Sequence, residues 1–412
     1  MTPKYRASVA LAALMALSAC GVFKGGGPKR TPTVGERVPI LSSENAIEPD
    51  RSIADIQVLL PAPAANADWP QPGGNPAHSL GQLVLADSPT RQWQASINGG
   101  SNRERLAAAP VVADGKLFVD DVTATVHALA ADTGKTLWST SLTEGKVNRA
   151  ARFGGGVSYD SGKVYATDGL GDVVALNAAD GKEVWRSKPG GPLRGAPTVA
   201  NGSVYVLSQD NQIFALSDAD GKVQWVQSGT LESQGVFGVA APASSQGTVV
   251  AGFSSGELNA YRYENGRVYA VGQGGRMVAL DLATGQRLWE QNFAGISTPW
   301  IAGEWLFVVT DDARLICLAR SNGKARWIAQ LQRFANAKKN TGAQVTWFGP
   351  VLAGNKLVLT NSLGDVVFAN PSDGSVTGQI DGKKKEGYAL PPIVVNGTLY
   401  TLNQRGRITA YK

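Results

Sequence analysis

The chain has 412 residues, of which 43% are hydrophobic and 17% are charged, so its composition excludes a disordered acidic or basic protein. The formal net charge of +6 is weak for this length and does not predict nucleic-acid binding. Length alone would allow two or three domains. However, the chain has 49 Gly and 21 Pro and no long segment with a period of 3.6 residues, which favours a turn-rich all-β fold.

Residues 1–19 have the pattern of a signal peptide: a basic start, then an apolar run that is too short to span a bilayer. Small residues then lead to Cys20, and this motif resembles a bacterial lipobox. The resemblance implies cleavage before Cys20 and its lipidation by several acyl chains, which together anchor a protein stably. Because Gly21 is not Asp, it also implies sorting to the outer membrane. The alternative is an ordinary secretory signal with an accidental cysteine.

Residues 20–66 are dominated by Gly, Pro and small polar residues, as in GGGPKRTPT and LLPAPAANAD. This composition predicts a flexible tether with no core of its own. We expect the tether to hold the folded body at a distance from the lipid surface. We expect the folded body to occupy residues 67–412.

A pattern of strands and glycine turns recurs along most of that body. The clearest copy is GKVYATDGLGDVVALNAADGKEVW at 162–185, where apolar residues alternate with period two and Asp-Gly supplies a hairpin turn. Each copy starts with a small-Pro-apolar segment such as APTV at Ala196, and a Gly turn later leads to a strand that usually carries Trp. One unit is about four strands in roughly 40–45 residues, the period of a propeller blade.

A ring of such blades is the fold that this repetition predicts. A single four-stranded sheet cannot bury both faces, so the blades must pack side by side, and a ring leaves only short, protected edges. The recurring Trp is then a wedge between blades, since one aromatic side chain buries a large apolar area. The alternative is a β-sandwich with coincidental glycine turns.

Two irregularities concern the closure of this ring. Residues 92–97 look like a Trp strand without a hairpin of their own, and the last repeat has no Trp strand, so we predict that 92–97 complete the last blade. The glycines that begin the central hairpins are 37 to 51 residues apart, except for 19 residues between Gly247 and Gly266. One outer strand, one connection and one inner strand are missing there. We expect eight blades with two incomplete, or seven with one hairpin reassigned, and a weak sector at the unpaired edges.

The signal, the tether and the Gly-x-x-x-Trp repeats together resemble the BamB family, the propeller lipoproteins of the β-barrel assembly machinery in Gram-negative outer membranes. More specific motifs are DWPQPGGNPAHS, which begins at Asp68, and PLRGAP at 192–197, before the third blade. The resemblance implies an eight-bladed propeller without enzymatic activity or cofactor, anchored by lipid on the periplasmic face of the outer membrane. It implies BamA, other subunits of the BAM complex and unfolded outer membrane proteins as partners.

The resemblance also implies a docking site. In the family, a Leu-Arg-Gly loop before the third blade helps to dock a periplasmic POTRA domain of BamA. Carried over to this chain, Leu193 is the apolar anchor and Arg194 the charged hydrogen-bonding partner. A second family contact, an acidic Leu-Ser-Asp-x-Asp loop after the fourth blade, is missing here, and its expected place is the short interval at Gly266. The alternative for Leu193 and Arg194 is an ordinary exposed loop.

An enzyme is the competing class, because dehydrogenases that use pyrroloquinoline quinone share the repeat. Those proteins are longer and have a vicinal Cys pair and a Ca²⁺ site. Here the cysteines are Cys20 and Cys317, and the apolar run around Cys317 predicts a buried small hydrophobe. His78 and His127 do not have metal-ligand spacing. We therefore expect no cofactor, no metal and no catalysis.

Two acidic pairs, at 120–121 and 311–312, would be the remaining catalytic candidates, but their positions favour hairpin tips. No nucleophile elbow, phosphate loop or paired-carboxylate motif occurs. A generic periplasmic propeller that binds polysaccharide or peptide stays open as a third class.

Overall fold

The structure of the protein is a computed structural model. The residues that it describes are 47–101, 104–143, 154–229, 241–245, 248–253, 258–261, 266–272, 274–282, 284–382 and 386–412. The side chains of Arg194 and of residues 258–261 are not described. The predicted signal peptide at 1–19, the predicted lipidation site Cys20 and the first part of the predicted tether lie outside the described residues.

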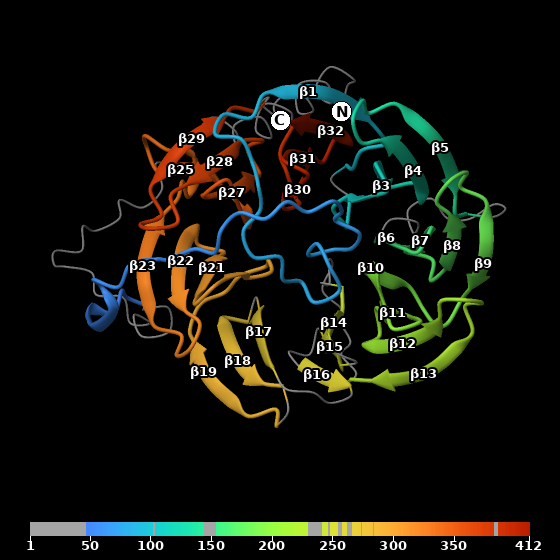
Figure 1. The fold of residues 1–412 in the computed structure, drawn as a ribbon, viewed down its shortest axis with the longest axis horizontal. Helices are drawn as coiled ribbons and strands as arrows, with labels where there is room; N and C mark the ends of the chain where they lie inside the picture. Colours follow the sequence, from blue (N-terminus) through green and yellow to red (C-terminus); the bar gives the residue numbers. More distant parts are fainter. Residues whose placement is uncertain are drawn as a thin grey trace, which may run out of the picture. The chain divides into compact units, whose positions relative to one another are not determined.

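Eight antiparallel sheets follow one another around a ring, as Figure 1 shows. Among the described residues, six of these sheets have four strands and two have three. We call each sheet a blade and number the blades 1 to 8 in chain order from β2. The propeller prediction is therefore confirmed, and of its two variants the structure has the one with eight blades, two of them incomplete.

Blades 1 to 3 each have four strands. Their bounds are β2 (Val111–Ala113), β3 (Lys116–Asp120), β4 (Thr125–Ala130), β5 (Thr136–Ser141); β6 (Gly155–Asp160), β7 (Lys163–Asp168), β8 (Val173–Asn177), β9 (Glu183–Ser187); β10 (Leu193–Ala200), β11 (Ser203–Ser208), β12 (Gln212–Ser217), β13 (Val223–Ser228). The three-stranded blades 4 and 5 comprise β14 (Ala243–Ser245), β15 (Thr248–Gly252), β16 (Leu258–Tyr261); β17 (Arg267–Gly272), β18 (Arg276–Asp281), β19 (Arg287–Gln291).

Blades 6 to 8 again have four strands. Their bounds are β20 (Trp300–Ala302), β21 (Trp305–Val309), β22 (Arg314–Ala319), β23 (Ala325–Gln330); β26 (Trp347–Ala353), β27 (Lys356–Asn361), β28 (Val366–Ala369), β29 (Val376–Ile380); β30 (Ile393–Val395), β31 (Thr398–Leu402), β32 (Arg407–Tyr411) and β1 (Arg91–Ser96). A separate hairpin of β24 (Phe334–Asn336) and β25 (Thr341–Gln344) lies between blades 6 and 7.

The last blade is closed by strands from both ends of the described chain. β1 pairs with β32, and five residue pairs define the register from Arg91–Tyr411 to Ser96–Arg407. Next to this ladder, Thr90 and Lys412 exchange both backbone hydrogen bonds, at 2.8 and 2.9 Å. The prediction that residues 92–97 complete the last blade is confirmed.

The repeated Gly-x-x-x-Trp motif joins neighbouring blades. Trp138 on outer strand β5 donates from Nε1 to the carbonyl of Ala178 in blade 2 at 3.1 Å. A Cβ added to Gly181, whose φ is 73°, would lie 2.5 Å from the Trp138 ring. The motif therefore needs Gly for the left-handed turn and for the space that the preceding Trp occupies. The same contact occurs at Trp93–Gly134, Trp138–Gly181, Trp185–Gly221, Trp289–Gly323 and Trp327–Gly374.

Gly181→Ala is expected to lower the free energy of unfolding by at least about 3 kcal/mol, because backbone strain and overpacking against Trp138 add. Gly285 offers a matched control: its φ is 67°, and nothing lies within 4 Å of an added Cβ. Gly285→Ala should therefore cost only the strain, about 1–2 kcal/mol. Urea unfolding of both variants measures the difference in the free energy of unfolding. Equal losses in the two variants would contradict the role of Trp138 as a wedge between blades.

The incomplete sector leaves apolar residues less covered than in the complete blades. Blade 4 lacks the fourth strand and blade 5 lacks the first, among the described residues, which are the strands that the sequence predicts to be missing. β11, the second strand of a complete blade, is buried at all six residues. β17 has the same place in blade 5, but its apolar residues Val268, Ala270 and Val271 are only half-buried because no inner strand covers its edge.

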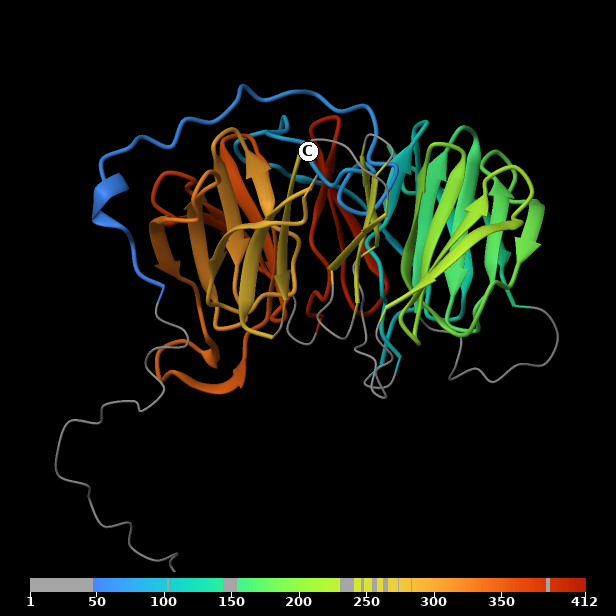
Figure 2. The same ribbon diagram turned by 90° about the horizontal axis from the view of Figure 1, so that it is seen from below.

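Residues 47–89 form a strap across one face of the ring, and we call this side the strap face and the opposite side the loop face (Figure 2). The 3₁₀ helix η2 (Arg51–Ile53) lies in the strap, and Ile47, Ile53 and Val58 are buried. Asp50 pairs with Lys324 of blade 6 at 2.9 Å. The prediction that residues 20–66 are all flexible tether is therefore wrong for 47–66, because these apolar residues and backbone bonds hold them on the propeller.

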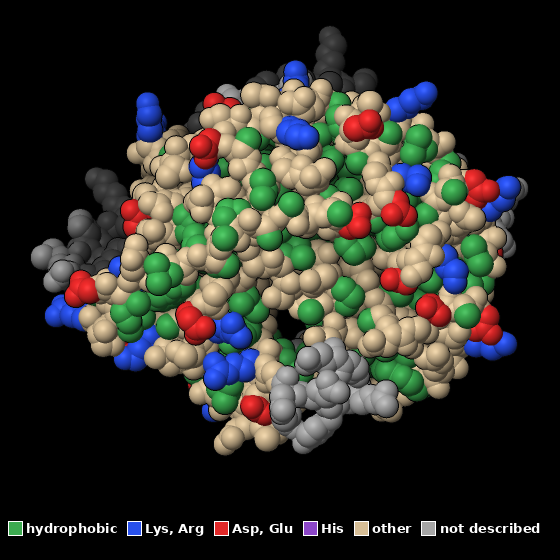
Figure 3. All heavy atoms as spheres, in the orientation of Figure 1, with side chains coloured by type: hydrophobic (Ala, Val, Ile, Leu, Met, Phe, Trp, Pro, Cys, Tyr) green, Lys and Arg blue, Asp and Glu red, His purple; other side chains and the backbone are tan. Residues whose placement is uncertain are grey.

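The strap then crosses the centre of the ring. Trp69, 3% exposed, exchanges backbone hydrogen bonds with Val112 of blade 1 and stacks on Trp300 of blade 6, with ring centroids 6.1 Å apart. Further along, the backbone of Leu83 pairs with blade 7, and Leu85 with blade 8. Figure 3 shows the strap face, with charged side chains mainly around the rim and a largely uncharged centre. The strap thus ties inner strands of distant blades together.

No helix in the described part of the chain has the length and apolar character that crossing a bilayer requires.

Candidate functional site

The predicted docking residues begin strand β10, at its loop-face end. Leu193 and Arg194 pair with Ser208 and Leu207 of β11. The register then shifts between Arg194 and Thr198, so the strand has a bulge. The bulge contains Gly195 with a φ of 65°, a conformation that a residue without Cβ adopts at no steric cost.

Hydrogen bonds from neighbouring segments fix this strand end. Thr167 Oγ1 of blade 2 donates to the carbonyl of Gly195 at 2.8 Å. The backbone N–H of Gln209 donates to the carbonyl of Pro192 at 2.7 Å. The backbone around Arg194 is therefore held in one conformation from both sides.

Leu193 does not lie on the surface. Its side chain is 2% exposed and belongs to a buried cluster with Tyr165, Trp185 and Phe214. Its predicted role as the apolar anchor of a partner is therefore corrected: the side chain of Leu193 packs between blades 2 and 3. Successive side chains of β10 point to opposite faces of the sheet. The face that carries Leu193 is buried because blade 2 packs against it.

One supporting residue was not predicted by sequence reasoning. Gln71 of the strap is 2% exposed, and its side-chain amide exchanges hydrogen bonds of 2.7 and 2.9 Å with the backbone of Val199 in β10. It belongs to the DWPQPGG motif, so the motif itself was the available signal. β10 is thus fixed at its strap-face end as well.

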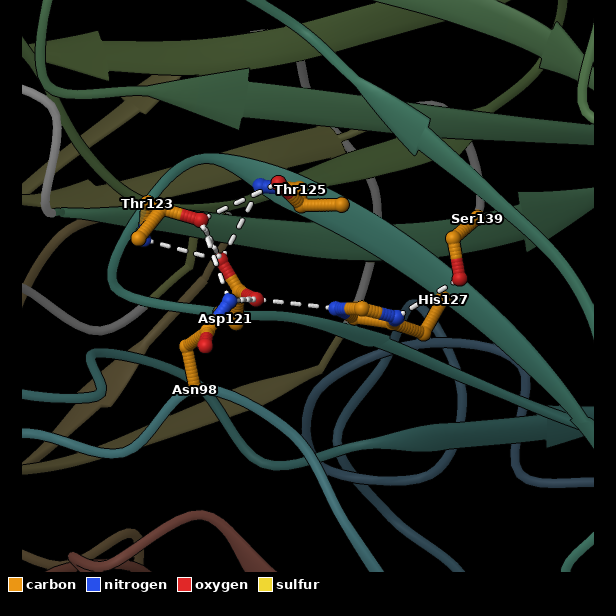
Figure 4. Close-up of polar contacts among 6 residues, drawn as sticks. All are labelled: Asn98, Asp121, Thr123, Thr125, His127 and Ser139. Carbon is orange, nitrogen blue, oxygen red and sulfur yellow. Dashed lines mark hydrogen bonds and ion pairs between the residues drawn. The ribbon is translucent and has the colours of Figure 1, made fainter.

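A second polar cluster on the loop face includes a histidine (Figure 4). His127 Nε2 and Asp121 Oδ2 are 2.8 Å apart, and His127 Nδ1 and Ser139 Oγ are also 2.8 Å apart. Asp121 further accepts hydrogen bonds from Asn98 and from the backbone and hydroxyl of Thr123. Burial opposes ionisation of Asp121, but hydrogen bonds from His127 and Thr123 outweigh it and lower the pKa of this carboxyl.

Ser139, His127 and Asp121 have the residue types of a nucleophile, a base and an acid. However, the turn cap that Asp121 makes recurs in other blades, which points to a structural role. Asp121 caps the turn between the second and third strands by accepting from the N–H groups of residues 123 and 125. Asp168, Asn361 and Asn403 accept from the equivalent N–H groups in blades 2, 7 and 8. A polar side chain at this turn satisfies buried backbone donors, so Asp121 is a hairpin-tip residue as predicted.

Two carboxyls lie near these turns, the buried Asp168 and the half-buried Asp120. Burial raises the pKa of Asp168, whose Oδ1 caps its turn. Burial, followed by the charges of Asp121 and Asp168, raises the pKa of Asp120 well above its usual range. In the described residues, no group of three His, Cys, Asp or Glu side chains is placed to hold a metal ion.

A family model described as outer membrane protein assembly factor BamB matches residues 81–150, 145–268 and 262–329. The sequence is 30% identical over 368 residues to outer membrane protein assembly factor BamB of Salmonella typhimurium, covering 80% of this chain and 91% of that protein. This chain belongs to the BamB family. The BamB of Xanthomonas campestris is 28% identical over 78% of this chain and 85% of its own length.

Solved structures show the same fold at lower identity. The crystal structure of BamB from Moraxella catarrhalis has a TM-score of 0.62 and 16% identity, covering 79% of this chain and 98% of that one. Quinohemoprotein alcohol dehydrogenase from Comamonas testosteroni has a TM-score of 0.51 and 16% identity, covering 84% and 81%. Both likenesses concern the propeller alone.

Two residues weighed as enzymatic candidates lie in packed surroundings within this BamB-family fold. Cys317 on β22 is fully buried, as its apolar neighbours predict, and burial raises the pKa of its thiol. His78 lies in the strap, where burial lowers its pKa to about 4. The place expected for the family's acidic loop, the short interval at Gly266, lies partly outside the described residues, because 254–257 and 262–265 are not among them.

Proposed function

We propose that this chain is a non-enzymatic scaffold lipoprotein of the outer membrane β-barrel assembly (BAM) complex. The observation that carries the proposal is the 30% identity to a BamB, which extends over 91% of that protein's length. Lipidated Cys20 would anchor the chain on the periplasmic face of the outer membrane, and residues 21–46 would be the remaining tether. The ring would assist insertion of β-barrel proteins by contact alone, with unfolded outer membrane proteins as clients received by edge pairing.

The proposed partner is BamA, through a periplasmic POTRA domain that docks at the start of β10. Because Leu193 is buried, its role in the proposal is support of the strand end. Arg194 supplies the contact, since a guanidinium can bind a partner carboxylate with two parallel hydrogen bonds. The pairing of Arg194 with Leu207 supports this role, because a backbone that is already ordered loses little entropy on binding.

Arg194→Glu is expected to weaken binding of the mature chain to BamA at least tenfold, about 1.4 kcal/mol, as expected when an interface arginine is replaced by an opposite charge. Affinity is measured by titrating purified BamA periplasmic domains onto the immobilised protein. Arg405→Glu is the matched control: Arg405 is an exposed arginine in the β31–β32 turn on the same face. Equal affinity of the Arg194→Glu variant and the parent protein would remove this docking assignment.

Leu193→Ala serves as a second comparison. Because the side chain is buried, this change is expected to cost about 2–5 kcal/mol of folding stability. A loss of BamA binding by this variant therefore counts only if its circular dichroism and melting curve stay those of a folded protein.

The non-enzymatic part of the proposal has its own test. The quinohemoprotein dehydrogenase likeness is limited to 16% identity and to the fold. We expect no dye reduction when the protein is incubated with pyrroloquinoline quinone, Ca²⁺ and alcohols. Turnover that depends on the added quinone would contradict the scaffold role.

A further inference from the structure

The β24–β25 hairpin differs from the other described connections between blades. It lies on the loop face, where Figure 2 shows it in orange below the ring. Its two strands form a separate sheet, and no third strand in the described part of the chain pairs with either of them. The outer edge of each strand can therefore pair with another strand, although on β24 the carbonyl of Phe334 already accepts from Gln332 Nε2 at 2.8 Å.

The charge around this hairpin is strongly asymmetric. From Ala313 to Gly364 the sequence holds eight Lys or Arg and no Asp or Glu. Three of these cations pair with acids outside this stretch, in the ion pairs Arg314–Asp312, Lys324–Asp50 and Lys356–Asp87. Arg320 and Arg326 donate to backbone carbonyls.

The remaining three of the eight cations lie in or next to the hairpin. Arg333, Lys338 and Lys339 are exposed and have no acidic partner among the described residues. Arg333 lies over the Phe334 ring, 5.6 Å from its centroid, and this contact attracts the guanidinium without adding a negative charge. A concentration of one sign of charge on an exposed edge favours a partner of the opposite sign.

The base of the hairpin is held rigidly. Trp347, 5% exposed, donates from Nε1 to the carbonyl of Gln332 at 2.9 Å. The N–H of Val345 donates to the carbonyl of Arg333 at 2.8 Å, and Gln344 Nε2 donates to the carbonyl of Asp311 at 2.9 Å. An isolated two-stranded hairpin is marginal in water, so the bonds to Trp347 and Asp311 tie this one to the ring, while the Val345–Arg333 bond extends its own ladder.

A cleft runs beside β24. Its volume is about 470 Å³, and residues 330–334 line it together with Ala337 and Asn340. Buried Leu331 and half-buried Phe334 give the cleft apolar side chains, and Arg333 adds a charge. Apolar and basic groups next to a free strand edge are complementary to an extended segment whose side chains alternate between apolar and acidic.

We propose that the β24–β25 hairpin binds an extended, acidic polypeptide segment of a partner protein, which adds as a strand to the free edge of β24. Backbone hydrogen bonds hold the segment, and its carboxylates lie against Arg333, Lys338 and Lys339. This site is separate from β10, which belongs to blade 3, so it goes beyond the docking function proposed above.

The test uses the full mature chain and a fluorescent synthetic peptide of alternating Glu and Val, with binding followed by anisotropy at low salt. Lys338→Gln with Lys339→Gln is expected to weaken binding about fivefold to tenfold, and physiological salt should weaken it as well. A peptide of alternating Lys and Val should not bind. The same Glu-Val peptide with methylated backbone nitrogens should bind at least about fivefold more weakly, because it has lost its strand donors.

The matched control is Lys182→Gln with Lys222→Gln, two lysines in exposed turns on the strap face. Unchanged peptide affinity in the Lys338/Lys339 variant would overturn the proposal. Equal binding of the methylated peptide would overturn strand addition. If the variant loses binding only to phosphatidylglycerol vesicles, the hairpin is a membrane contact instead. BamA binding should survive in this variant, so failure here and failure of the β10 docking are distinguishable.

Discussion

Replacement of residues 91–96 by a Gly/Ser linker of equal length is expected to lower the melting temperature by at least about 10 °C. β1 is the outer strand of blade 8, and Trp93 reaches from it into blade 1, where its Nε1 donates to the carbonyl of Ala131 at 3.0 Å. Loss of a packed Trp costs about 3–5 kcal/mol, and each lost ladder hydrogen bond about 1 kcal/mol. Differential scanning calorimetry of the linker variant measures the shift.

The rescue experiment separates ring closure from other effects of the linker. Thr90 and Lys412 are already paired through both backbone hydrogen bonds. A two-residue Asn-Gly turn after Lys412 can therefore lead into a second copy of residues 90–98 in the native orientation. We expect this copy to restore most of the lost melting temperature. A linker variant that melts like the parent protein would show that the ring does not depend on β1.

Trp69→Ala is expected to lower the free energy of unfolding by about 3–5 kcal/mol, the usual cost of truncating a buried aromatic side chain. Trp69 is the point where the strap enters the ring, and it touches both blade 1 and blade 6 through Val112 and Trp300. The change removes this packing and leaves a cavity between them. Urea unfolding followed by circular dichroism gives the loss and the slope of the transition.

Two neighbouring variants calibrate this result. Gln71→Ala should cost about 1–3 kcal/mol, because the buried backbone of Val199 loses both partners. Leu59→Ala, in the same strap but 67% exposed, should change stability by less than about 0.5 kcal/mol. A loss of under about 1 kcal/mol for Trp69→Ala would mean that the strap does not brace the ring.

Local patterns in the chain were sufficient to predict the propeller and its defect. Period-two alternation with Asp-Gly turns specifies hairpins, and hairpins with two apolar faces need neighbours. The short interval between Gly247 and Gly266 likewise predicted that two strands are missing from blades 4 and 5, and the described residues of these blades form three strands each.

The candidate site was predicted only in outline, because it depends on contacts between distant segments. PLRGAP placed Leu193 and Arg194 at the start of a blade, but the burial of Leu193 depends on Tyr165 and Trp185 of the blade before it. A strand pattern shows that two faces differ, and the packing of neighbouring blades decides which face is covered.

The sequence by itself determined the repeat, the closure by 92–97, the missing strands and the membership of the BamB family. Only the tertiary structure decided that residues 47–89 lie across the ring and that residues 334–344 stand out from it with free edges. The physical reason is the separation along the chain of the residues that interact. Turns and strands follow from residues a few positions apart, whereas Gln71 and Val199 are 128 residues apart and meet only when the ring has closed.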